Sequence, residues 1–226
     1  ALMNRGKLLL SELDEDDVGD EEAVKNIVRS HRHRLQIGES KEGAAANLLL
    51  ETALRAAFSG WRFPLHFIDF ETARPTLPYT KGRKPNQQLL FQFSHHLLSQ
   101  SGRLEHKSQY LLATPGVDPN AAVVRALRDA LAGDDGTVIH WWDHERSVLT
   151  DVQTQLSASA EPDRQELDAF IGSLTKSNSG HPARLVDMGR PLVAETVFVA
   201  DTDGRSSIKK LLKAVMAQSD FLRERY

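Results

Sequence analysis

Residues 64–72 read PLHFIDFET, and this stretch decides the fold. Large apolar side chains alternate through 64–70, which favours a buried β-strand, and two acids, Asp69 and Glu71, stand at its end. Side chains two apart in a strand leave the same face, about 7 Å apart, so both carboxylates point the same way. The sequence therefore predicts a buried strand that ends in an acidic pair.

The segments that follow this strand predict an α/β domain. A loop rich in Pro, Gly, Lys and Arg spans 74–88, and strands follow at 89–98 and 105–112. Helices and strands then alternate: a helix at 119–132, a strand at 137–142, a helix from there to about 156, a helix from about 162 to 175, a short strand or helix entry at 184–188, and a helix at 206–217. Three strands in succession, followed by this alternation, indicate a mixed sheet flanked by helices.

We expect a helical extension or linker at 1–60, ahead of a domain at 61–226. Good helix formers predict a helix at 43–58, and 21–35 is compatible with another. Between Glu12 and Glu22, eight of eleven residues are acidic, which is typical of a solvated linker or helix surface. Because the chain stops within a charged, helical stretch, we also expect the domain to be truncated at its C-terminus.

The composition excludes several classes of protein. The 226 residues hold 28 Lys and Arg against 31 Asp and Glu, a net charge of −3, which excludes a generally basic nucleic-acid coat but not a local basic groove. The lack of cysteine excludes disulfides and thiolate zinc sites, and it fits a reducing cytoplasm. No apolar run approaches the roughly 20 residues that cross a bilayer, so we expect a cytoplasmic protein without a membrane partner. No phosphate-binding glycine loop, dinucleotide loop, nucleophile elbow or zincin helix occurs.

Asp69 and Glu71 point to metal chemistry. Carboxylate oxygens are preferred ligands of Mg²⁺ and Mn²⁺, and two such ions about 3.5–4 Å apart promote phosphodiester cleavage. Lys81, Arg83 and Lys84 follow in the next loop, where they would attract phosphates without sequence preference. The alternative is that the acidic pair merely ends a strand and caps the following turn.

Polar side chains on the second strand form another candidate group. Alternation places Gln92, Ser94 and His96 on one face, opposite Phe91, Phe93 and His95. The alternative is a partly exposed polar set at a strand edge, without a ligand.

The start of the last predicted helix is a candidate phosphate site. Ser206, Ser207 and Lys209 stand where free backbone N–H groups favour anions. Simple N-capping by Ser206 is the alternative.

Five segments resemble, in order, an uncharacterised bacterial family, the domain of unknown function numbered 2779. They are HFIDFET (66–72), GRKPNQQLLFQFSHHL (82–97), TVIHWWDHERSVL (137–149), LVDMGRP (185–191) and GRSSIKKLLKAV (204–215). The resemblance covers about residues 61–217, and it implies an RNase H-like fold related to metal-dependent 3′–5′ exonucleases with four catalytic acids. In longer members it also implies a preceding nuclease region, which would lie before Ala1.

The resemblance implies roles for single residues. Asp69 and Glu71 match the first acidic motif, and Glu145 matches the second, both motifs supplying metal ligands. The second motif has an Asn four residues before its acid, whereas this chain has Trp141 there, with Asp143 as a nearby substitute. An ordinary first-turn acid favoured by the helix dipole is the alternative for Glu145.

Other positions carry over in the same way. Asp187 matches an acid on the next strand and is a further expected metal ligand, while Gln92 and His96 are expected to line the site. The last acid of the superfamily should follow the helix at 206–217, and the chain ends before it.

These features together imply a nuclease domain that uses Mg²⁺ or Mn²⁺. Asp69, Glu71 and Glu145 are the expected catalytic residues, and the substrate class is single-stranded or frayed DNA or RNA. Because Trp141 replaces the expected Asn and the last acid is missing, an inactive RNase H-like module that binds nucleic acid or a partner protein is the alternative.

Overall fold

The structure, a computed structural model, describes residues 7, 9–14, 17, 32–37, 47–78, 80, 82–177 and 183–225. The chain divides into two compact units: one is Trp61–Asp187, and the other joins Ala1–Gly60 to Met188–Tyr226. Within the described residues, no helix is both long enough and apolar enough to cross a membrane.

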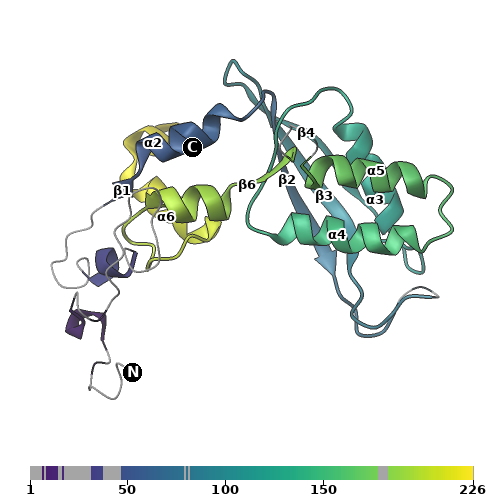
Figure 1. Cartoon of the computed structure of the whole chain (residues 1–226), viewed down its shortest axis with the longest axis horizontal. Helices are drawn as coiled ribbons and strands as arrows, with labels where there is room; N and C mark the ends of the chain where they lie inside the picture. Colours follow the sequence, from purple (N-terminus) through teal and green to yellow (C-terminus); the bar gives the residue numbers. More distant parts are fainter. Residues whose placement is uncertain are drawn as a thin grey trace. The chain divides into compact units, whose positions relative to one another are not determined.

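The Trp61–Asp187 unit is built on a mixed five-stranded sheet (Figure 1). Its strands are β2 (Leu65–Ala73), β3 (Leu89–Leu98), β4 (Leu104–Leu111), β5 (Val138–His140) and β6 (Leu185–Asp187). They lie in the order β4-β3-β2-β5-β6, in which β4–β3 and β3–β2 pair antiparallel and β2–β5 and β5–β6 pair parallel. The predicted α/β class and mixed sheet with three leading strands are confirmed.

Three helices of this unit cover one face of the sheet (Figure 1). They are α3 (Asn120–Ala130), α4 (His144–Ser157) and α5 (Arg164–Thr175), which the sequence predicted to within about two residues. Each has an apolar stripe, at positions such as Val124, Val148 and Leu167, that joins one core cluster with sheet residues such as Ile68 and Phe70, and α5 packs mainly on α3 and α4. Burial of this stripe positions the start of α4 beside the end of β5.

Buried polar side chains fix the helices to the sheet. Asn120, at the start of α3, accepts from the Leu90 N–H (2.8 Å) and donates to the Gln155 side chain (2.9 Å). Arg146, in the first turn of α4, donates to the carbonyl oxygens of Thr175 and Leu185, both at 2.6 Å. These bonds satisfy groups at the ends of α5 and β6, so they hold the start of α4 in place.

A chain of hydrogen bonds runs through the buried histidines on the helix-covered face. His66 Nε2 lies 2.8 Å from Asp134 Oδ1, His66 Nδ1 lies 2.9 Å from His95 Nε2, and His95 Nδ1 lies 3.0 Å from Ser108 Oγ. A carboxylate accepts only, so His66 Nε2–H donates to Asp134, whereas the directions of the other two bonds depend on the tautomers of His66 and His95. Both ring nitrogens of each histidine therefore have a polar partner.

This network makes the stability of the unit depend on pH. Burial lowers the pKa of His95 from 6.5 to about 4, helped by nearby His66, His96 and Lys107 and opposed by Asp134. Between pH 6.5 and about 4, His95 is therefore protonated in the unfolded chain but not in the folded chain. Because the unfolded state binds the extra proton, the free energy of unfolding falls as the pH drops through this range. At about 1.4 kcal/mol per pH unit, we expect a loss of roughly 3 kcal/mol.

Urea titrations at pH 7 and pH 4.5 measure this loss. His95→Gln should flatten the pH dependence, whereas His33→Gln, at an exposed site in the other unit, should leave it as in the wild type. Equal pH dependence in the wild type and His95→Gln would contradict the prediction.

The other unit contains short elements. They are a 3₁₀ turn at Leu10–Glu12, β1 (Leu48–Leu49), α2 (Glu51–Ser59), a π-helical turn at Gly189–Ala194, β7 (Val197–Phe198), α6 (Ile208–Gln218) and α7 (Asp220–Arg225). Residues 32–37 are also helical, whereas the rest of the helix predicted at 21–35 and residues 43–46 lie outside the described residues.

Two predictions for this unit are wrong. The helix expected at 43–58 begins only at Glu51, because Leu48 and Leu49 pair with β7 as a strand. Tertiary pairing has overridden the helix propensity of this stretch. The N-cap of α6 is Ser207 rather than Ser206, and its side chain makes no capping hydrogen bond.

Candidate functional site

The candidate site lies on the sheet face opposite the helices. Asp69 and Glu71 are both exposed on β2, and their cross-strand partners on β3 are Ser94 and Gln92. His96 continues the same face of β3, so the predicted polar row is on the same side as the acidic pair. Carboxylates and polar side chains of two strands therefore form one continuous surface.

A bulge interrupts this alternation and creates a cavity. The register shifts between Glu71 and Thr72, and Leu90 and Phe93, three residues apart, are both buried in the core. Phe91 instead lines an open, mostly apolar cavity of about 580 Å³, together with Ala73, Leu89, Leu112, Ala113, Thr114, Pro115, Gly116, Val117 and Pro119. Of the three side chains predicted opposite Gln92, Phe93 and His95 are buried and Phe91 is half-buried.

Glu145 joins the acidic pair from a different element. Partial burial raises the pKa of Asp69, and the negative charges of Glu145 and Glu71 raise it further, against the opposing effects of His144 and the Phe70 N–H. Such coupling requires the carboxylates to lie near one another. The carboxyl ends of the parallel strands β2 and β5 bring them together, because only three residues separate the end of β5 from the start of α4.

Glu145 has an unusual environment for an acid in a first helical turn. It is only 3% exposed, whereas the side chain of Glu166, in the first turn of α5, is 73% exposed. Glu145 Oε2 lies 3.3 Å from His140 Nδ1, yet the geometry makes no hydrogen bond and leaves both atoms unsatisfied. Buried carboxylates without hydrogen bonds are costly, so the helix dipole alone does not account for this position.

Asp187 organises the turn that leads to Glu145. It pairs with His140 across β5 and β6, and its Oδ1 accepts from the Trp142 N–H at 2.8 Å. Trp142 has φ of +63°, a left-handed conformation that ends β5 at His140, two residues earlier than predicted. Asp187, which was predicted as a metal ligand, thus also holds the turn that leads to Glu145.

Residues 66–207 match the family model of a domain of unknown function, DUF2779. The chain belongs to this family. Comparison with curated proteins gave no match, and comparison with solved structures gave none either.

The DUF2779 match includes the three clustered acids and Asp187. In the described part of the chain, however, no three His, Asp or Glu side chains are arranged to hold a metal ion. The carboxylate of Glu145 lies beside His140.

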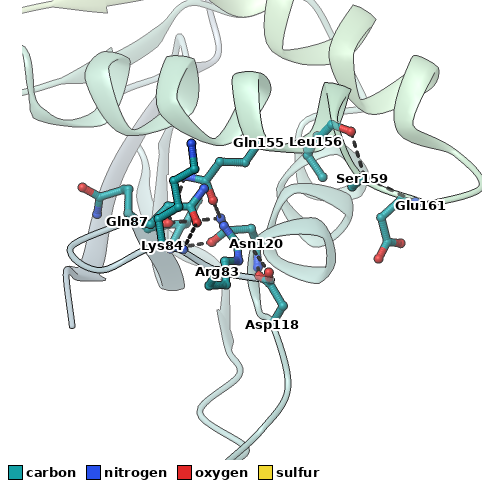
Figure 2. A network of polar contacts seen from close by, with 11 residues as sticks. Arg83, Lys84, Gln87, Asp118, Asn120, Gln155, Leu156, Ser159 and Glu161 are labelled. Atoms are coloured by element: carbon teal, nitrogen blue, oxygen red, sulfur yellow. Dashed lines mark hydrogen bonds and ion pairs between the residues drawn. The ribbon is translucent and has the colours of Figure 1, made fainter. Parts of the chain in front are cut away.

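One cation of the predicted basic loop in this DUF2779 chain is held in an ion pair. Arg83 forms an ion pair with Asp118, next to Asn120 at the start of α3 (Figure 2). Its side chain is only 14% exposed, so the pair occupies a guanidinium that was expected to bind phosphate. Lys84 is exposed, and its N–H donates to Gln87, while Lys81 lies outside the described residues.

The remaining predicted contacts lie in the other unit. Ser207 and Lys209 are exposed at the start of α6, and the DUF2779 match ends at Ser207. Two residues were not among the predicted site residues. His144 has an electrostatic effect that lowers the pKa of Asp69, and His106 lies opposite His96. His144 could have been found from its position just after a predicted strand. The pairing of His106 with His96 depends on a β-bulge, which no local sequence pattern predicts.

Proposed function

We propose that this chain is a nuclease domain that hydrolyses phosphodiesters of single-stranded or frayed nucleic acid with a divalent cation, as a 3′–5′ exonuclease. The observation that carries the proposal is the convergence of Asp69, Glu71 and Glu145 from β2 and α4. The sheet order, with three antiparallel strands followed by two parallel ones, supports the RNase H-like fold that the sequence resemblance implies.

The donor set fits Mg²⁺ or Mn²⁺ in chemical type. All three side chains offer carboxylate oxygens, and Glu145 Oε2 is a buried acceptor without a hydrogen bond. A bound cation would supply Lewis-acid chemistry for phosphodiester cleavage. Asp69 and Glu71 would hold it from the exposed strand face, and Glu145 would neutralise it from the first turn of α4.

Other residues of the same unit would bind the substrate. Lys84 is an exposed cation in the loop that follows β2, where it would attract a phosphate. Gln92 lies directly across from Glu71 and offers an amide to the sugar or phosphate. Asp187 would act indirectly, by holding the Trp142 turn ahead of Glu145.

Hydrolysis of end-labelled single-stranded DNA and RNA tests the proposal. We expect shortening from the 3′ end that needs Mg²⁺ or Mn²⁺ and stops with a chelator. No cleavage under any of these conditions, together with salt-sensitive binding that needs no metal, would favour the second candidate, an inactive nucleic-acid-binding module. Trp141, in place of the expected Asn, is the observation behind that candidate.

We make a separate prediction about substrate binding from the cavity beside Ala73. Phe91 offers an aromatic ring in a space large enough for a base, which Ala73, two residues after Glu71, also lines. Stacking of a base on an aromatic ring contributes about 1–3 kcal/mol, so Phe91→Ala should weaken binding of a single strand by that amount. Leu104→Ala removes an exposed apolar side chain at the other end of the sheet and is the control.

Fluorescence anisotropy with a labelled oligonucleotide measures both affinities. Equal weakening by the two substitutions would show that the cavity has no specific role.

A further inference from the structure

His96 and His106 form an exposed pair on neighbouring strands. They are direct cross-strand partners on β3 and β4, and both are exposed. The rings meet edge to face with centroids 4.8 Å apart, and His106 Nδ1 lies 3.4 Å from His96 Nε2. Two ring nitrogens therefore face each other at the surface of a sheet.

The separation of these nitrogens suits two ligands of one metal ion. The distance of 3.4 Å between His106 Nδ1 and His96 Nε2 is longer than the 2.7–3.2 Å of ordinary N–H hydrogen bonds. Two Zn–N bonds of about 2.0–2.1 Å at a tetrahedral angle place their nitrogens about 3.3–3.4 Å apart. The pairing of β3 with β4, next to the register shift between His95 and His96, sets this spacing.

The surrounding charges favour a cation at this position. Phe67 is the partner of His96 on β2, and Asp69 is the next residue on the same face, a diagonal neighbour within reach of long side chains. Lys107 is the nearest basic residue in sequence, and its ammonium group lies 3.5 Å from Glu105, which offsets its positive charge.

We propose that His96 and His106 bind a first-row transition ion such as Zn²⁺ or Ni²⁺ through two imidazole nitrogens, with the remaining coordination positions open to water or another ligand. Imidazole suits these ions, whereas Mg²⁺ prefers oxygen ligands. The site is therefore separate from the proposed carboxylate site, although both lie on one sheet face. His96 would then act as a metal ligand instead of a nucleic-acid contact.

Titration of untagged protein with Zn²⁺ in a calorimeter, and with Co²⁺ followed by visible absorption, tests the site. We expect one ion per chain, with the absorption bands of tetrahedral Co²⁺, and no displacement by excess Mg²⁺. Since loss of an outer partner of a metal ligand already costs about 10–100-fold in affinity, His96→Gln and His106→Gln should each weaken binding at least tenfold.

Two control variants separate this site from other sources of binding. His33→Gln, an exposed histidine of the other unit, should leave the affinity unchanged. Asp69→Asn should weaken binding less than either histidine substitution. The proposal is overturned if the wild type binds no ion with defined stoichiometry, or if Asp69→Asn abolishes binding while both histidine variants retain it. Circular dichroism confirms that each variant is folded.

Discussion

Asp69→Asn is expected to lower metal-dependent hydrolysis of a labelled single strand by at least about 10³-fold. Asparagine keeps the size of the side chain but removes the charge that holds the cation on the strand face. Metal stabilisation of the developing charge contributes several kcal/mol, and each 1.4 kcal/mol is about tenfold in rate. Initial rates with saturating Mn²⁺, for the wild type and the variant, measure the loss.

The matched control for this variant is Asp168→Asn. Asp168 is an exposed acid on α5, which packs on α3 and α4. It should retain the wild-type rate. If Asp69→Asn hydrolyses the strand as fast as the wild type, the proposed nuclease site is disproved, whatever the two variants bind.

Glu145→Gln is expected to separate activity from stability. The substitution removes a buried negative charge that repels Asp69 and whose Oε2 lacks a hydrogen bond. We therefore expect the free energy of unfolding to rise by roughly 1 kcal/mol. Hydrolysis should nevertheless fall at least about 100-fold, because one of the three carboxylates is lost.

Glu166→Gln is the control, since Glu166 stands in the first turn of α5 but is exposed. There the lost interaction with the helix dipole should reduce stability by about 0.3–1 kcal/mol without affecting hydrolysis. Urea unfolding and rate measurements on both variants decide the matter. If Glu145→Gln behaves like Glu166→Gln in both measurements, Glu145 is an ordinary first-turn acid.

The fold of the Trp61–Asp187 unit was largely predictable, because its signals are local. Alternating apolar side chains in PLHFIDF indicated β2, and good helix formers after Asp118 and Pro119 indicated α3. The start of β6 near Leu185 was also close. Prediction failed at Leu48 and Leu49, where pairing with a strand about 150 residues later in the chain replaces a local preference for helix.

The candidate site was predictable only in part. The spacing of Asp69 and Glu71 alone places both on one strand face, and the structure has them there. Arg83, by contrast, was expected to bind phosphate, but a partner 35 residues away, Asp118, occupies it. A sequence shows that a charge is present, whereas its availability depends on which opposite charge the fold brings beside it.

The sequence by itself determined the α/β class, the acidic pair on β2 and the family to which the chain belongs. Those properties depend on residue types at short, regular spacings, which any reader of the chain can measure. Only the tertiary structure decided that Glu145 is buried beside His140 and that His96 faces His106 at 3.4 Å. Both arrangements depend on strand register, helix placement and bulges, which arise from packing between segments far apart in the chain.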